Sequence, residues 1–230
     1  MNSMMSPNRI GIAMVLGLAC TVASAAEPTN ITAGELALTP PFCQDVQTIN
    51  GWSQYGHESP RAPHWVSLMG KTFWGMHHYC WALVGIHRSK AAGLSKQMRD
   101  FMIHSAIADH YYVVNIAPPG FPLLPEIYFR IGEAHVMVQE YPQAIEAFEK
   151  SREIKPDYWP PYVAQAELLE KMGLKSKAVA LLDEGLQKMP GEPTLTRHFK
   201  RLGGKPPAIA QASMGASAPD LRASPASAPQ

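Results

Sequence analysis

Apolar side chains recur every three or four positions along most of the chain between residues 71 and 202, which is the spacing of amphipathic α-helices. From Phe73 to Ile86 they lie on nearly every face, and this predicts a helix surrounded by protein. A second run begins after a candidate N-cap at Ser95 and continues to Ile116. Residues 42–62 carry turn residues and are expected to be irregular. The pattern therefore predicts an all-α fold.

Farther along the chain, the same residue types recur 34 positions apart in two helix-turn-helix units. Because proline lacks the N–H that continues a helix, one proline is expected to end each unit. Small residues are expected where the two helices of a unit cross closely, with aromatic side chains filling the space beside them. The matched pairs are Tyr128 and Tyr162, Ala144 and Ala178, and Pro156 and Pro190.

This spacing resembles the tetratricopeptide repeat (TPR). The resemblance implies a right-handed solenoid of helical hairpins over residues 125–190. A divergent N-terminal hairpin at 71–118 and a capping helix at 193–202 extend it. Three residues, His135, Ser151 and Gln165, depart from the family pattern. The residues that carry the pattern and its packing are Tyr128, Ile131, Gly132, Tyr141, Ala144, Phe148 and Pro156, then Tyr162, Ala166, Ala178, Leu182, Gly185 and Pro190.

Residues 1–25 have the three parts of a signal peptide: a short basic segment, an apolar run and the small residues Ala23-Ser24-Ala25. We therefore expect cleavage near Ala25 and export to a bacterial periplasm. The sequence Leu18-Ala19-Cys20 also resembles a lipobox, so an outer-membrane lipoprotein anchored through Cys20 is the less favoured alternative. No later segment is long and apolar enough to span a membrane.

Composition divides the remaining chain into four parts. Residues 26–41 are expected to be a tether, 42–122 an aromatic-rich helical region, and 123–204 the repeats with their cap. Residues 205–230 are rich in Ala, Ser and Pro, and cannot offset the entropy cost of ordering, so we expect a disordered tail.

Charge and cysteine content narrow the functional classes. With 20 Lys and Arg against 19 Asp and Glu, the chain has no basic excess to neutralise phosphates, so a nucleic-acid partner is not expected. Removal of Cys20 would leave Cys43 and Cys80, which are expected to pair in an oxidising compartment. Two buried free thiols are the alternative.

The helix at 73–87 carries the candidate chemistry. His77, Cys80 and His87 share one stripe, which permits a metal- or haem-handling role, but a structural zinc site needs more ligands than this. Cys80 with His77 or His78 has the residue types of a thiolate–imidazole pair. Such a pair on one helix is more often packing, and no catalytic motif is present. We therefore expect no metal, no cofactor and no enzyme activity.

The TPR resemblance implies that the first helix of each hairpin lines a concave groove that binds a segment of a partner protein. The resulting expectation is a protein-interaction scaffold or assembly factor. Apolar residues interspersed with carboxylates favour a basic, partly apolar partner segment. A solvated carboxylate face without a binding role is the alternative reading. The groove residues implied by the resemblance are Glu126, Phe129, Glu133, Val136, Met137, Val163, Glu167, Glu170 and Lys171.

Overall fold

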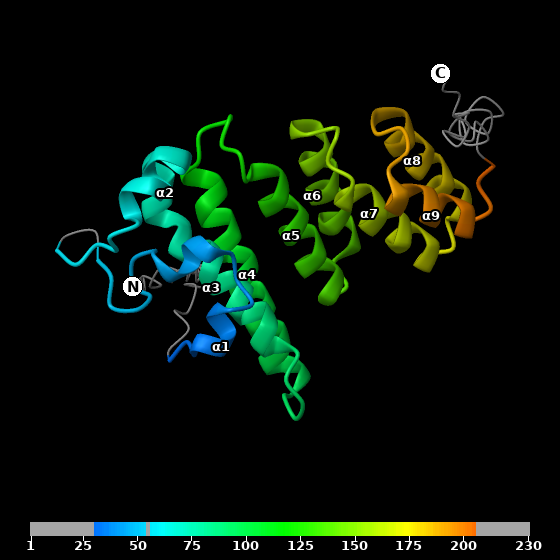
Figure 1. Ribbon diagram of the computed structural model, residues 1–230. Helices are drawn as coiled ribbons and strands as arrows, with labels where there is room; N and C mark the ends of the chain where they lie inside the picture. Colours follow the sequence, from blue (N-terminus) through cyan, green and yellow to red (C-terminus); the bar gives the residue numbers. More distant parts are fainter. Residues whose placement is uncertain (1–29, 54–55, 206–230) are drawn as a thin grey trace, which may run out of the picture.

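A computed structural model describes residues 30–53 and 56–205, and these contain helices, turns and no strand (Figure 1). The expected signal peptide, Cys20 and nearly all of the expected tail lie outside the described residues. Within the described part of the chain, no helix combines the length and apolar character needed to cross a membrane.

Three helical hairpins follow one another along the molecule, each made of two helices adjacent in the sequence (Figure 1). This arrangement confirms the predicted all-α fold of paired helices. A last helix, α9, packs against the third hairpin. The helices are α3 (Met76–Ser89) and α4 (Lys96–Ile116), α5 (Leu124–Met137) and α6 (Tyr141–Ile154), α7 (Pro160–Lys171) and α8 (Lys175–Lys188), and α9 (Pro193–Arg201).

The helix ends follow from local sequence. Ser95 caps α4, because its hydroxyl accepts a hydrogen bond from the backbone N–H of Met98 at 3.1 Å. The helices α4, α6 and α8 each end two residues before a proline, at Pro118, Pro156 and Pro190. Proline disfavours the helical conformation of the residue before it, so each hairpin ends where the sequence predicts.

The N-terminal part of the described chain is more ordered than expected. It forms α1 (Ala33–Leu36), the 3-10 helix η1 (Pro41–Gln44), α2 (Ala62–Met69) and the 3-10 helix η2 (Gly70–Gly75). A capping box of Thr32 and Glu35 caps the N-terminus of α1, and Arg88 of α3 donates to Glu35 at 2.5 Å. The expectation of a tether is therefore corrected for residues 30–41, which pack on α3. The expectation of irregular structure at 42–62 is corrected where η1 and the first residue of α2 fall within that range.

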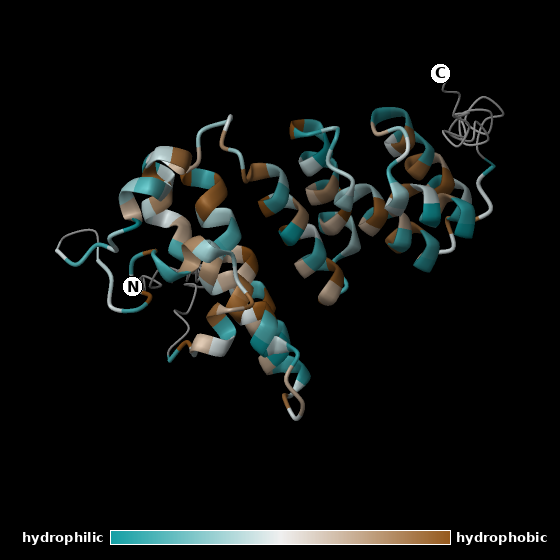
Figure 2. Cartoon of the chain, in the orientation of Figure 1, coloured by the Kyte–Doolittle hydropathy of each residue, from teal (hydrophilic) through white to brown (hydrophobic). Residues whose placement is uncertain are grey.

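The largest hydrophobic core lies between this N-terminal part and the first two hairpins. At its centre a disulfide joins Cys43 of η1 to Cys80 of α3, with both residues fully buried and their Cα atoms 5.6 Å apart. This confirms the predicted pairing. Hydropathy colouring shows apolar and polar residues interspersed along the helices of all three hairpins (Figure 2).

The three departures from the TPR pattern have polar partners. His135 contacts a carboxylate oxygen of Glu140 through Nδ1 at 2.7 Å. The hydroxyl of Ser151 donates to the carbonyl oxygen of Pro125 at 2.6 Å, and the side chain of Gln165 accepts from Arg152 at 2.8 Å. These three side chains are buried, and each has a hydrogen bond that offsets its loss of water.

Candidate binding groove

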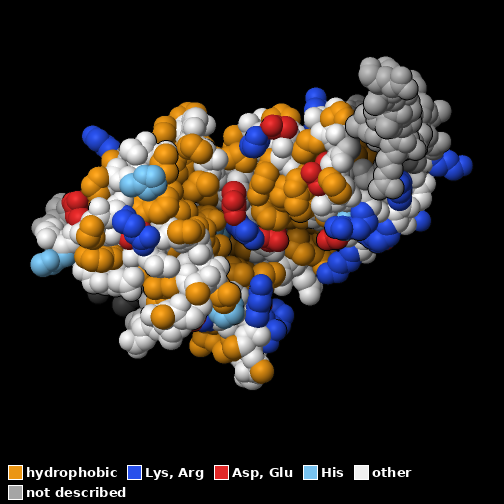
Figure 3. Space-filling model, viewed as in Figure 1, with side chains coloured by type: hydrophobic (Ala, Val, Ile, Leu, Met, Phe, Trp, Pro, Cys, Tyr) orange, Lys and Arg blue, Asp and Glu red, His pale blue; other side chains and the backbone are white. Residues whose placement is uncertain are grey.

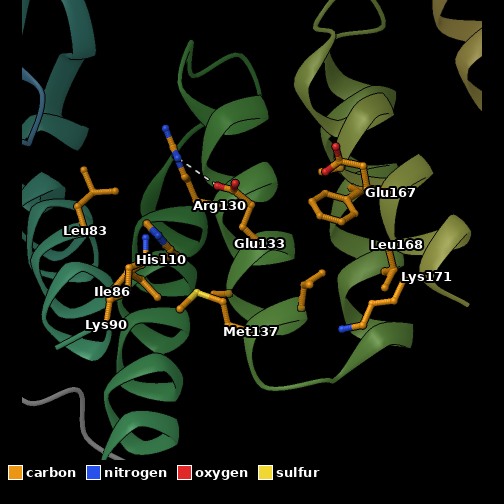
Figure 4. A pocket seen from close by; sticks show the side chains of 14 residues that line it. Leu83, Ile86, Lys90, His110, Arg130, Glu133, Met137, Glu167, Leu168 and Lys171 are labelled. Carbon is orange, nitrogen blue, oxygen red and sulfur yellow. Dashed lines mark hydrogen bonds and ion pairs between the residues drawn. The ribbon is translucent and has the colours of Figure 1, made fainter. Parts of the chain in front are cut away.

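A groove of about 490 Å³ lies between the three hairpins, with side chains of α3, α4, α5, α6 and α7 around it (Figure 4). Its lining is mainly apolar, with five charged side chains among the lining residues. The residues are Leu83, Ile86, Lys90, His110, Arg130, Glu133, Ala134, Val136, Met137, Phe148, Ala164, Glu167, Leu168 and Lys171. In the space-filling view, acidic and basic side chains stand next to one another amid apolar surface (Figure 3).

Arg130 of α5 is the central charged residue of the groove. Its guanidinium donates to Glu133 at 3.1 Å and to Glu126 at 3.0 Å, one turn away on either side. Burial opposes the charge of Arg130, but these two carboxylates raise the pKa of the guanidinium overall. Burial raises the pKa of Glu133 although Arg130 acts in the opposite direction. The negative charge of Glu133 is therefore already matched inside the protein.

His110 of α4 also lines the groove and lies near Arg130 (Figure 4). It is 1 % exposed, and its Nδ1 has no hydrogen-bond partner among the described residues. Burial, reinforced by the charge of Arg130, lowers the pKa of His110 to about 3. The imidazole is thus neutral at physiological pH and adds polarity without charge to the wall.

The two lysines of the groove occupy its opposite ends. Lys90 follows the last residue of α3, and Lys171 ends α7, where its ammonium lies 5.2 Å from the ring centroid of Tyr141. Met137 lies between them in Figure 4. Glu167 stands on the same helix as Lys171 and lies 3.5 Å from His198 Nδ1. Three cations and two carboxylates therefore line the groove, so it is not acidic.

A second pocket of about 430 Å³ extends the surface toward α1. It shares Leu83, Ile86, Lys90 and Arg130 with the groove, and Tyr79 and Glu126 form its inner wall. The hydroxyl of Tyr79 donates to Glu126 at 3.2 Å. Leu38 to Pro40 border the pocket, so the N-terminal segment bounds the groove surface at its first-hairpin end.

Five of the nine predicted groove residues line the groove: Glu133, Val136, Met137, Glu167 and Lys171. Glu126 lines the second pocket, and Glu170 pairs with Arg201 at 2.8 Å. Two of the predicted groove residues, Phe129 and Val163, are instead buried, with 9 % and 8 % of their surface exposed. The ring of Phe129 packs against Phe148 and Tyr158, so this side chain belongs to the core.

Three polar lining residues, Lys90, His110 and Arg130, were not predicted from the sequence. Lys90 and His110 belong to the first hairpin, to which the family's groove positions were not carried over. Arg130 had a readable signal, because Glu126 and Glu133 stand four residues before and three residues after it, the helix spacing at which opposite charges pair.

The candidate ligands of the helix at 73–87 have other partners. Cys80 is oxidised in the disulfide, so its sulfur is neither a thiolate nucleophile nor a thiolate ligand. His77 Nδ1 lies 2.9 Å from the carbonyl oxygen of Trp74, and burial lowers the pKa of His77 to about 4. His78 pairs with Asp109 at 2.6 Å. Across the described residues, no three metal-ligating side chains gather at one point.

Comparison with protein-family models gives no match for this chain, and comparison with curated proteins gives none either.

Proposed function

We propose that this chain is a TPR-like scaffold or assembly factor that binds a segment of another protein in the groove described above. The observation that carries the proposal is the composition of that groove: an apolar floor of Leu83, Ile86, Val136, Met137 and Leu168 bordered by charged side chains. Surfaces that bind protein segments likewise combine apolar area with polar and charged groups.

The charges point to a different partner from the basic one expected from sequence. Glu133 is matched by Arg130, whereas Lys90 and Lys171 stand at the ends of the floor without a carboxylate within ion-pair distance among the described residues. We therefore propose a mainly apolar segment that places acidic side chains near these lysines. Opposite charges across an interface raise the association rate and set the register of the bound segment.

Export to the periplasm is part of the same proposal, because the disulfide between Cys43 and Cys80 requires an oxidising compartment to persist. Anchoring through Cys20 is compatible with the same groove. In the disulfide, Cys80 supplies neither the sulfur ligand of a metal or haem site nor the thiolate nucleophile of an enzyme. We therefore propose a binding function without cofactor chemistry.

Site-specific photo-crosslinking tests this proposal. A photoreactive amino acid at position 137 is expected to capture one protein from an envelope extract. The same group at Met172, which is 43 % exposed but does not line the groove, is the matched control and should not capture it. Equal capture from both positions would show that the groove is not the binding surface.

The charge variants then test the partner's sign. Lys90→Glu and Lys171→Glu are expected to slow association with the captured protein, whereas Glu167→Lys should accelerate it or leave it unchanged. The reverse order of effects would restore the basic partner segment expected from sequence.

A further inference from the structure

The outward side of α4 carries a stripe of mainly apolar residues. Its residues follow one another at intervals of three or four, so they share one side of the helix. The stripe is about 27 Å long at the rise of an α-helix. Its four large side chains are 43–53 % exposed, and two small residues lie between them. In chain order the stripe consists of Met98, Phe101, Ser105, Ala108, Tyr112 and Ile116.

The outward sides of the second helices in the other two hairpins are charged. On α6 the exposed positions include Glu146, Glu149, Lys150 and Glu153, and on α8 they include Lys177, Glu184 and Lys188. By contrast, the segment 101–116 contains a single acidic residue, Asp109, and no lysine or arginine. Asp109 is 2 % exposed and is bound to His78. A continuous exposed apolar face on a helix marks an interaction surface.

Two large side chains of the stripe pack against α3 and η2 of the same chain. The ring of Tyr112 lies against that of His78, with centroids 3.8 Å apart. Ile116 fills the space over Gly75, where an added β carbon would come within 2.1 Å of Ile116 Cδ1. These contacts fix the positions of two large side chains, so their exposed surfaces are available without rearrangement.

We propose that α4 packs against α4 of a second copy of this chain, antiparallel to it and related by a two-fold axis near residues 105–108. The order of side-chain sizes along the stripe reads nearly the same in both directions: large, aromatic, small, small, aromatic, large. Antiparallel pairing therefore places Phe101 of each copy opposite Tyr112 of the other. Ser105 and Ala108 meet at the axis, where small residues let two helices approach closely. Such self-complementarity is what a two-fold interface requires.

The charges at the two ends of α4 complement this arrangement. Its first turns carry Lys96 and Arg99, with no acidic residue in the first turn, and its last turn carries no basic residue. This is the reverse of what the dipole of the helix itself favours, although Asp100 pairs with Lys96. In an antiparallel pair, these cations lie beside the partially negative carbonyl end of the other α4. A parallel pair would bring the four cations together.

The mass of the full chain in solution tests the proposal, in a Cys20→Ser background that excludes accidental cross-linking. Sedimentation equilibrium at micromolar concentrations is expected to give twice the mass of one chain. Phe101→Glu should give one chain mass with an unchanged circular dichroism spectrum. Ile154→Glu, at an exposed apolar position of α6, is the matched control and should remain dimeric. A monomeric parent, or a dimeric Phe101→Glu, would overturn the proposal.

Orientation is tested with the single variants Phe101→Cys and Tyr112→Cys. A mixture of the two, equilibrated and then oxidised, should form a disulfide between positions 101 and 112. Each variant alone should not, because its two copies would be displaced by about 16 Å along the helix axis, beyond the reach of a disulfide. Cross-linking of either variant with itself, or no product from the mixture, would overturn the antiparallel arrangement.

Discussion

Gly132 of α5 faces the ring of Phe148 of α6 at the crossing of the second hairpin. A β carbon at position 132 would lie 2.5 Å from Cε1 of that ring. The ring has little room to move, because Phe148 is fully buried and its centroid lies 6.1 Å from that of Phe129. The absence of a side chain at position 132 is thus what allows α5 and α6 to pack at this distance.

Gly132→Ala is expected to destabilise the fold by about 1–3 kcal/mol, the usual cost of overpacking a core. The sign is informative, because alanine in place of glycine in an unobstructed helix stabilises by about 1 kcal/mol. Urea unfolding followed by circular dichroism measures the difference. Gly120→Ala, where an added β carbon meets nothing within 4 Å, is the control and should change stability little. A stabilised Gly132→Ala variant would contradict the crossing described here.

Loss of the disulfide should weaken the N-terminal part of the fold. Cys43 and Cys80 close a loop with a sequence separation of 37. In the chain-entropy account, their joint replacement by alanine lowers the free energy of unfolding by about 4 kcal/mol. Thermal unfolding with and without reductant measures this. Reductant should lower the midpoint of the parent and leave that of the double variant unchanged. An equal effect on both would mean that the bond contributes nothing.

Acid should destabilise the protein through its buried histidines. The pKa of His110 is lowered to about 3 and that of His77 to about 4, so the folded protein keeps both neutral while the unfolded chain takes up protons near pH 6.5. The stability that each contributes is complete above pH 6.5 and is lost as the pH falls toward the folded pKa. Between pH 7 and pH 5.5, each histidine should lower the free energy of unfolding by about 1 kcal/mol.

The variant His110→Gln isolates one of these groups. Its unfolding free energy, measured in urea at both pH values, should fall by about 1 kcal/mol less than that of the parent over the same interval. An identical pH dependence of parent and variant would mean that the pKa of His110 is the same in the folded and the unfolded protein.

Much of the fold could be predicted from the sequence because its helical hairpins repeat along the chain. The prolines at 118, 156 and 190 follow the ends of α4, α6 and α8 where expected, and Ser95 caps the start of α4, since these effects are local to a few residues. The order in residues 30–41 depends on Arg88, more than 50 residues later, holding Glu35. That contact is not visible in local sequence, although the capping box of Thr32 and Glu35 is.

The residues that line the groove could be predicted only in part, because some of them depend on contacts outside the repeat. Family positions correctly located Glu133, Met137 and Glu167, because these follow from the phase of the helix. The burial of Phe129 depends on Tyr158, which lies in the connection between α6 and α7. Repeat spacing carries no information about such a connection, so the same helix phase predicted exposure where a loop residue covers the ring.

The contrast between Phe129 and Met137 separates core from groove. Phe129→Ala should lower the free energy of unfolding by about 3–5 kcal/mol, because it removes a buried aromatic ring. Met137 is 37 % exposed and lines the groove, so Met137→Ala should change stability by less than about 1 kcal/mol yet weaken binding of the captured protein. Surface binding assays at a temperature where both variants are folded measure the second effect. Met172→Ala, exposed outside the groove, is the control and should leave both quantities near those of the parent. Unchanged binding by Met137→Ala, with weakened binding by folded Phe129→Ala, would mean that the partner contacts the protein at Phe129 after all.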